Sequence, residues 1–231
     1  MVPPPQGPHP RDPQPQRVVL ATRNAHKVAE LTRILAATGD GSVVDLVGLA
    51  AWPGAPDVAE TGRTFEENAL LKARAIAVFT GMPAIADDSG LCVDALNGMP
   101  GVLSARWAGG HGDDGANLAL VLAQLMDVPP ARRGARFVCA AALVVPAAKS
   151  PAVCQPSIER VAAGQLMGRL TSSPRGSHGF GYDPIFVPEG DTRTTAEMDP
   201  AEKDAISHRG RAFRALATVI SEILGPGGAA R

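Results

Sequence analysis

Cysteine is scarce in this 231-residue chain, which contains only three. Cys92, Cys139 and Cys154 are odd in number, widely spaced and not part of any CxxC pair. This pattern excludes a disulfide scaffold and argues against a zinc site, because both need paired or closely spaced cysteines. We therefore expect reduced thiols and a cytoplasmic location.

The chain also lacks a long hydrophobic run and an excess of charge of one sign. Its longest weakly polar run, residues 137–148, contains Pro146 and falls short of the roughly 18 residues that a transmembrane helix needs. The formal net charge is -1, and no block of basic residues is present to bind a nucleic-acid backbone. We therefore expect neither a membrane nor a nucleic-acid polymer as a partner.

Proline is concentrated at the start of the chain, where residues 1–16 hold seven of the 21 prolines. This segment has neither a basic start nor an apolar stretch, so it does not have the pattern of a signal peptide. We expect a disordered or polyproline-like tail over residues 1–16, a single folded domain over 17–225 and a flexible C-terminus over 226–231.

Strand-like and helix-like patterns are mixed along the folded part, which predicts the α/β class. Thr64 and Glu67 fit a capping box that starts a helix ending at Gly81, and Asp199 fits the N-cap of a later helix. The expected strands are residues 17–22, 42–49, 83–86, 136–145 and 157–170, and the other expected helices are residues 25–37, 114–126 and 209–224.

The first candidate site lies where the first strand meets the first helix. Thr22, Asn24 and Lys27 surround the start of this helix, whose free N–H groups and dipole favour an anion. Lys27 leans back toward that end, because helical side chains tilt toward the N-terminus. The pattern indicates a phosphate cradle; the alternative is a capping asparagine and a solvated lysine.

The second candidate group lies around the helix that begins after Thr64. Asn68 and Lys72 are four residues apart and share one helix face, so they can present an amide and an ammonium to the same ligand. Glu60 and Glu67 add carboxylates nearby. The alternative is an ordinary polar surface helix, in which Glu67 only closes the capping box.

The third group is the run Asp87, Asp88, Ser89, which follows the expected strand at residues 83–86. Neighbouring side chains of an extended chain point to opposite faces, so we expect only one of the two aspartates to face a cleft. Carboxylates at a strand end suit Mg²⁺, which takes one or two protein oxygens together with substrate phosphates. The alternative is a polar turn.

The fourth group combines an aromatic loop with donors further along the chain. Phe180 and Tyr182, the only tyrosine, lie beside glycines that allow close approach to a planar base. His208 and Arg209 supply hydrogen-bond donors, which favour a ring with a carbonyl over one with an amino group. The alternative for both aromatic side chains is packing in the core.

Together these residues lie in segments that resemble the five signature blocks of the inosine triphosphate pyrophosphatase family. The segments, in chain order, are residues 19–31 (VLATRNAHKVAEL), 60–75 (ETGRTFEENALLKARA), 84–109 (AIADDSGLCVDALNGMPGVLSARWAG), 179–186 (GFGYDPIF) and 202–212 (EKDAISHRGRA). The resemblance implies a two-lobed α/β fold with a mixed sheet, flanking helices and a central nucleotide-binding cleft. It also implies hydrolysis of dITP, ITP and XTP to the monophosphate and pyrophosphate by a Mg²⁺-dependent cytosolic homodimer.

The resemblance further implies a role for each matching residue. Asp88 corresponds to the proton acceptor and a metal-linked carboxylate, and Lys72 is expected to act with it; Glu60 is the second candidate metal ligand, with Asp87 also near the metal. The expected substrate contacts are Thr22, Arg23, Asn24, Ala25, His26, Lys27, Asn68, Ser89, Phe180, Gly181, Tyr182, Asp183, Lys203, His208 and Arg209. Arg23 and His26 occupy variable positions of the first block.

Two alternatives to this function are left open by the sequence. A related pyrophosphatase acting on pyrimidine or modified nucleotides would share the phosphate-binding residues. A nucleotide sensor without catalysis would bind the same ligands, although the complete set of carboxylates and lysines argues against it.

Overall fold

The computed structural model describes residues 16–36, 44–110, 112–147 and 156–225. The tail expected up to residue 16 lies outside the described residues except for Gln16, which begins the first strand. The expected flexible C-terminus, residues 226–231, also lies outside them, as does Cys154. The described cysteines, Cys92 and Cys139, are both free and buried.

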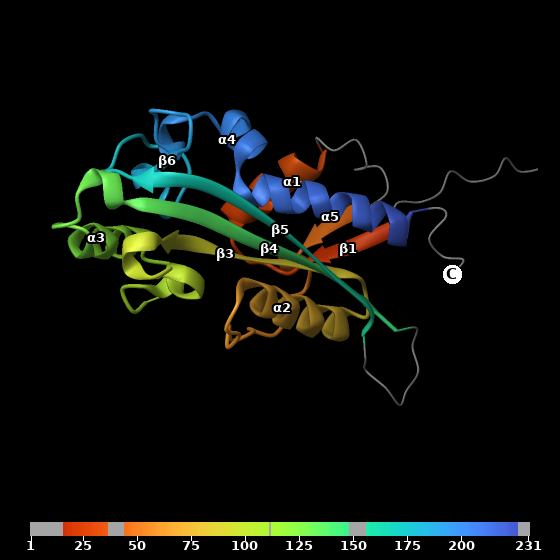
Figure 1. Ribbon diagram of the computed structural model, residues 1–231. Helices are drawn as coiled ribbons and strands as arrows, with labels where there is room; N and C mark the ends of the chain where they lie inside the picture. The colour runs from red at the N-terminus through yellow and green to blue at the C-terminus, as the bar shows by residue number, and fades with distance from the viewer. Residues whose placement is uncertain (1–15, 37–43, 111, 148–155, 226–231) are drawn as a thin grey trace, which may run out of the picture.

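A mixed sheet forms the centre of the molecule (Figure 1). Its strand order is β2-β1-β3-β4-β5-β6; β1 runs parallel to β2 and β3, and the remaining neighbours are antiparallel. The strands are β1 (Gln16–Leu20), β2 (Val44–Gly48), β3 (Ala84–Val93), β4 (Gly134–Pro146), β5 (Pro156–Leu170) and β6 (Phe186–Pro188).

Helices cover both faces of this sheet and confirm the α/β class (Figure 1). One face packs on α2 through a cluster that includes Phe65 and Ile76, and the other packs on α1 and α5 through Leu31 and Phe213. The helices are α1 (Ala25–Ala36), α2 (Phe65–Thr80), α3 (Asp114–Gln124), α4 (Pro200–Ile206) and α5 (His208–Leu224).

The long strands β3, β4 and β5 join two lobes. They extend beyond the short β1 and β2 to a third apolar cluster, which contains Leu91, Val121 and Phe186 and packs against α3. Figure 1 shows α3 and β6 at this end of the sheet, away from β1. The two-lobed shape implied by the resemblance therefore follows from the unequal lengths of the strands.

The predicted helix ends are largely confirmed. The hydroxyl of Thr64 accepts a hydrogen bond from the N–H of Glu67 (3.2 Å), and α2 ends at Gly81 in the left-handed conformation. The Glu67 carboxylate, however, accepts from the N–H of Arg63 (2.6 Å), so the expected reciprocal bond is shifted by one residue. Asp199 forms a complete capping box at the start of α4.

The strand expected at residues 83–86 is longer than predicted. Strand β3 does not stop at Asp87 and Asp88 but continues to Val93, paired along its whole length with β4. On its other side β1 pairs only with Ala84 and Ile85, and an isolated bridge joins Cys92 to Pro100, so among the described residues no strand pairs with this edge of β3 from Ala86 to Leu91. The run Asp87, Asp88, Ser89, which predicted the end of β3, instead lies just beyond the end of the neighbouring strand β1.

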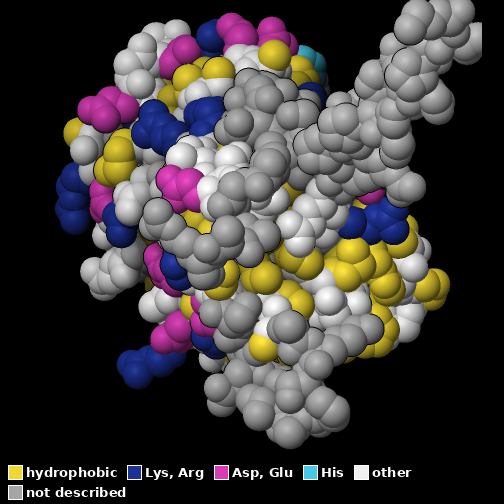
Figure 2. Space-filling model, turned by 90° about the vertical axis from the view of Figure 1, so that its right-hand side faces the viewer, with side chains coloured by type: hydrophobic (Ala, Val, Ile, Leu, Met, Phe, Trp, Pro, Cys, Tyr) yellow, Lys and Arg dark blue, Asp and Glu magenta, His cyan; other side chains and the backbone are white. Residues whose placement is uncertain are grey.

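None of the described helices is long and apolar enough to cross a membrane. On the face drawn in Figure 2, acidic and basic side chains are interspersed, and hydrophobic side chains gather beside them.

Helix α5 lies close to β5 at Gly164, and this contact places the start of α5 beside the sheet. A Cβ at residue 164 would collide with the carbonyl oxygen of His208 and lie 2.6 Å from the nitrogen of Ala212. We expect Gly164→Ala to lower the free energy of unfolding by about 1–3 kcal/mol, because both neighbours are backbone atoms. Urea denaturation of this variant measures the loss.

The control is Gly48→Ala, since a Cβ at Gly48 meets no atom within 4 Å. It should change the free energy of unfolding by less than about 0.5 kcal/mol. Equal effects of the two substitutions would contradict the close approach of α5 to β5.

Candidate active site

A cavity of about 630 Å³ lies beside the open edge of β3 and is lined by residues of both lobes. It brings together residues from all four groups that the sequence singled out, although they come from distant parts of the chain. Asn68, an expected substrate contact, is fully buried, and neither Asn68 nor Glu67 is among the described residues that line the cavity. The predicted residues that line it are Thr22, Arg23, Asn24, Lys27, Glu60, Lys72, Asp87, Asp88, Ser89, Phe180, Gly181, Tyr182, Asp183, Lys203, His208 and Arg209. Ala25 and His26 begin α1, and their side chains lie outside the described part of the structure.

The junction of β1 and α1 supplies the first wall of the cavity. The side-chain oxygen of Asn24 accepts from the N–H of Lys27 (3.2 Å), so the capping alternative is correct for Asn24. Lys27 nevertheless leans back as expected, and its Nζ lies 3.1 Å from Asp87. The lysine is therefore part of the site rather than a freely solvated side chain.

Arg23 joins this junction to the irregular segment before α2. Its guanidinium pairs with Asp57 and donates a hydrogen bond to the carbonyl of Ala55 (2.5 Å). Arg23 and Asp57 both line the cavity. Arg23 thus connects the start of α1 to the segment before α2 at the wall of the cavity.

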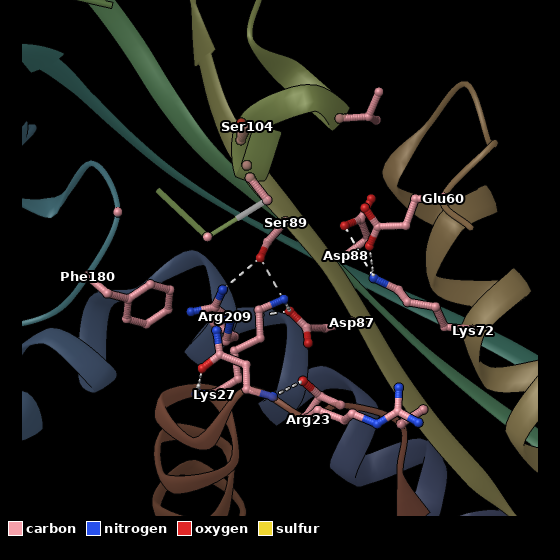
Figure 3. A pocket seen from close by; sticks show the side chains of 18 of the residues that line it. Arg23, Lys27, Glu60, Lys72, Asp87, Asp88, Ser89, Ser104, Phe180 and Arg209 are labelled. Atoms are coloured by element: carbon pink, nitrogen blue, oxygen red, sulfur yellow. Dashed lines mark hydrogen bonds and ion pairs between the residues drawn. The ribbon is translucent and has the colours of Figure 1, made fainter. Parts of the chain in front are cut away.

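Asp88 is surrounded by polar groups from α2 and the segment before it (Figure 3). Lys72 Nζ lies 2.6 Å from Glu60 Oε1 and 3.4 Å from Asp88 Oδ1. The amide of Asn68 donates to Asp88 Oδ2 (3.0 Å) and accepts from the N–H of Gly62 (2.7 Å). The predicted shared face of Asn68 and Lys72 is confirmed, because both side chains contact Asp88.

Asp87 has a separate set of cations (Figure 3). Its Oδ2 lies 3.1 Å from Lys27 Nζ and 3.4 Å from Arg209 Nε, and it accepts from the hydroxyl of Ser89 (3.3 Å). The expectation that only one aspartate would face the cleft is wrong, since Asp87 and Asp88 both line the cavity. The cavity reaches both faces of β3 because none of the described strands pairs with this edge at Asp87 and Asp88.

The pKa values of the two adjacent carboxylates are shifted in opposite directions. Burial acts to raise the pKa of Asp87, but Lys27, Arg209 and Lys72 outweigh it and hold this pKa well below its usual value. Burial also raises the pKa of Asp88, and there the nearby Glu60 carboxylate opposes Lys72, so the pKa stays raised. Asp88 is therefore the stronger base of the two.

Lys72 remains charged in this setting. Burial acts to lower its pKa, but Asp88, Asp87 and Glu60 together raise the pKa above the ordinary lysine value. The ammonium is thus available to neutralise negative charge on a ligand.

The aromatic loop forms the opposite end of the cavity. Two cations flank the ring of Phe180: Lys203 Nζ lies 5.2 Å and the Arg209 guanidinium carbon 5.3 Å from its centroid. Tyr182 is mainly a core residue, as its alternative predicted, because its ring joins the third apolar cluster and its hydroxyl donates to the Ser104 carbonyl (2.8 Å). Asp183 is buried and pairs with Lys203 at 2.6 Å.

His208 and Arg209 start α5 beside this loop. His208 is buried and stacks on Phe137 with ring centroids 4.8 Å apart, and its Nδ1 has no hydrogen-bond partner among the described residues. Burial, Arg209 and Lys203 lower the pKa of His208 well below its ordinary value, so the imidazole is neutral. Arg209 donates to Ser89 Oγ (2.7 Å) and so links the start of α5 to β3.

Sequence reasoning missed several residues at or beside the site, among them Asp57 and Asp114, which line the cavity, and the partners of Arg209 and Glu60. Glu30 is buried in α1, and its Oε2 lies 2.5 Å from Arg209 Nη1. It follows Lys27 by three residues and shares its helix face, which is a signal that could have found it. Arg106 donates to Glu60 Oε2 (2.9 Å), and no spacing in the sequence indicates this contact.

Glu60 and Asp88 fit a magnesium ion that is held jointly with substrate phosphates. No cluster of three or more potential ligands is present within the described ranges, so a metal site made by the protein alone is not seen there. Both carboxylates contact Lys72 and line one cavity, and Glu60 raises the pKa of Asp88. A divalent cation relieves such repulsion, and Mg²⁺ needs only one or two protein oxygens when phosphates complete its shell.

The fold and the cavity together are typical of a class of enzymes, nucleotide hydrolases with an α/β fold. The paired carboxylates and ammonium groups suit hydrolysis of a phosphoanhydride bond. Comparison with known proteins gives the family. The model of the Ham1 family matches residues 18–219, and the chain therefore belongs to this family.

Curated relatives match over nearly their full length. The dITP/XTP pyrophosphatase of Streptomyces coelicolor is 60% identical over 209 residues, which cover 90% of this chain and 99% of the relative. That of Frankia alni is 60% identical over 213 residues, covering 90% and 98%. The resemblance stated from the five sequence blocks is thus confirmed.

Solved structures share the fold. A nucleoside-triphosphatase described as a dITP/XTP pyrophosphatase from Mycobacterium abscessus is 55% identical with a TM-score of 0.68, covering 87% of this chain and 98% of that one. A HAM1 protein from Coxiella burnetii is 40% identical with a TM-score of 0.76, covering 90% and 99%.

The neutral state of His208 predicts a pH dependence of stability. The unfolded chain binds a proton at this histidine below pH about 6.5, whereas the folded protein does so only at much lower pH. The free energy of unfolding should therefore fall with decreasing pH, by up to about 1.4 kcal/mol per unit below 6.5 from His208 alone.

Urea denaturation at pH 7.5 and 5.5 measures this effect, and His208→Asn serves as the comparison. The variant should lose less stability than the wild type between the two pH values. Identical losses would show that His208 is not buried in its neutral form.

Proposed function

We propose that the protein hydrolyses dITP, ITP and XTP to the nucleoside monophosphate and pyrophosphate. The observation that carries this proposal is the position of Lys72 between Glu60 and Asp88, in the same cavity as Lys27 and the aromatic loop. The dITP/XTP pyrophosphatases among its relatives support the same reaction.

Positive groups on both sides of β3 bind the triphosphate. Lys27 and Lys72 lie at the α1 and α2 sides of the cavity, and Lys203 lies near the base end. Charge develops on the pyrophosphate as it leaves, and fixed ammonium groups stabilise that charge. The start of α1, where the helix dipole is positive, adds a favourable site for a phosphate.

Asp88 accepts a proton from the water that attacks the α-phosphorus. Its hydrogen bond from Asn68 fixes the plane of the carboxylate, and its other oxygen, Oδ1, faces Lys72. Glu60 and Asp88 would hold Mg²⁺, which neutralises phosphate charge when bound. Asp87, held ionised by Lys27 and Arg209, organises the other face of β3.

The base binds between the aromatic loop and the start of α5. Phe180 provides a planar surface, and Arg209 and His208, which also line the cavity, offer polar contacts to the 6-oxo edge of the purine. A base with an amino group at that edge leaves a buried donor unpaired, which costs about 1–3 kcal/mol.

Three finer assignments are part of this proposal: Mg²⁺ as the cofactor, a homodimer and a cytoplasmic location. The carboxylate pair at Lys72 supports the first. The free, buried Cys92 and Cys139 are in keeping with a reducing compartment. The homodimer rests on the family resemblance.

Replacement of the proposed base gives a direct test. Asp88→Asn should lower kcat for dITP by about 10²–10⁴-fold, because the amide cannot accept the proton, while nucleotide binding persists. Steady-state kinetics and isothermal titration with dITP measure the two effects. The matched control is Asp45→Asn, an exposed carboxylate on β2, which should keep full activity. Full activity of Asp88→Asn would refute its role.

Substrate comparison separates the proposed function from its alternatives. With Mg²⁺, kcat/KM for dITP should exceed that for dTTP by at least about tenfold, and EDTA should abolish pyrophosphate release. A preference for dTTP would favour a pyrimidine-directed pyrophosphatase. Binding of dITP without pyrophosphate release would favour a sensor.

A further inference from the structure

Glu60 lies in an irregular segment that secondary structure does not hold in place. Between the end of a short helical turn at Ala51 and the start of α2 at Phe65, the chain has neither helix nor strand. A carboxylate that shares Lys72 with Asp88 needs a fixed position, and the segment must obtain it from contacts with other parts of the chain.

Arg106 provides such a contact with both the side chain and the backbone of Glu60. Its Nη1 donates to Glu60 Oε2 (2.9 Å) and its Nη2 to the Glu60 carbonyl oxygen (3.2 Å). One planar guanidinium thus fixes the carboxylate relative to its own main chain. A lysine cannot reproduce this fork, because its donors radiate from a single nitrogen.

Arg106 is itself on a well-anchored element, the short helix η4 (Gly101–Arg106). Ser104 ties η4 to β3, since its Oγ accepts from the N–H of Leu91 (2.9 Å). After Arg106, the Trp107 indole donates to Gln124 Oε1 (3.0 Å), which ties the chain to α3. The backbone that carries Arg106 is therefore held in place on both sides by hydrogen bonds.

The contact bears on the reacting groups although Arg106 is not among the described residues that line the cavity. Glu60 uses Oε2 for Arg106 and Oε1 for Lys72, and Lys72 in turn contacts Asp88. Figure 3 shows the carboxylates of Glu60 and Asp88 side by side next to Lys72. Movement of Glu60 would change the spacing of the two carboxylates.

We propose that Arg106 is a positioning residue, which holds Glu60 against Lys72 and Asp88 and thereby sets how tightly the protein binds a magnesium–triphosphate complex. This inference rests on the proposed function and adds a residue to it. Arg106 acts only through Glu60 and does not touch the substrate.

Two substitutions and one control test the proposal in the full-length protein. Arg106→Met removes both hydrogen bonds but keeps an unbranched side chain, and Arg106→Lys keeps the charge without the fork. Arg74→Met is the matched control, because the Arg74 guanidinium also makes two hydrogen bonds to one glutamate, Glu159 (2.6 Å and 2.6 Å), outside the cavity.

The first readout is the Mg²⁺ concentration that gives half-maximal hydrolysis of dITP. Arg106→Met should raise it by about tenfold or more, since hydrogen bonds to a charged group are lost, and Arg106→Lys should give a smaller rise. Arg74→Met should leave it unchanged. An unchanged Mg²⁺ requirement in Arg106→Met would overturn the inference.

The second readout does not depend on turnover. With Mg²⁺ and the non-hydrolysable α,β-imido analogue of dITP, the rise in Tm should be smaller for Arg106→Met than for the wild type. A purely structural role would lower the Tm of the ligand-free protein but leave the ligand-induced rise intact, and that result would contradict the proposal.

A double-mutant cycle tests whether Arg106 acts through Glu60. In a Glu60→Ala background, Arg106→Met should change kcat/KM for dITP by less than about twofold, because its partner is already gone. Equal losses in both backgrounds would overturn the inference. Absence of dITP hydrolysis in the wild type and in Arg74→Met would overturn the proposed function as well, whereas normal wild-type turnover with an unaffected Arg106→Met overturns the inference alone.

Discussion

The site depends on the alternation of side chains along β3. Asp87 and Asp88 are adjacent in the chain, yet the pleat directs them to opposite faces, where each meets different cations. If both carboxylates shared one set of partners, their repulsion would force one to bind a proton. Separation across the strand instead allows one strongly acidic and one more basic aspartate within a single cavity.

The surrounding elements supply charges that match this division. On the Asp87 face, buried Arg209 joins α5 to Glu30 of α1, so the helices that cover this face are linked by ion pairs. On the Asp88 face, Glu60 forms ion pairs with Lys72 of α2 and with Arg106, and these pairs link α2 to the segment before it. Removal of one member of a buried pair leaves the other uncompensated, which makes such pairs costly to break. The ammonium and guanidinium groups of these pairs are also the groups that suit a polyphosphate ligand.

Much of this arrangement could be predicted from local patterns. The caps of α2 and α4 depend on residues a few positions apart, and so does the shared face of Asn68 and Lys72. The continuation of β3 through Asp87 and Asp88 could not be predicted, because it depends on pairing with β4, some fifty residues later in the chain. The same holds for the contact of Arg106 with Glu60, which links two segments with no common periodicity. Family resemblance supplied roles that local patterns could not.

The central claim is that chemistry takes place on the Asp88 face of β3. A crystal structure of the protein with Mg²⁺ and the α,β-imido analogue of dITP tests it most directly. We expect the α-phosphorus to lie beside Asp88 and Lys72, with the base against Phe180. An α-phosphorus bound instead next to Asp87 and Arg209, with Asp88 and Glu60 making no contact to metal or phosphate, would contradict it.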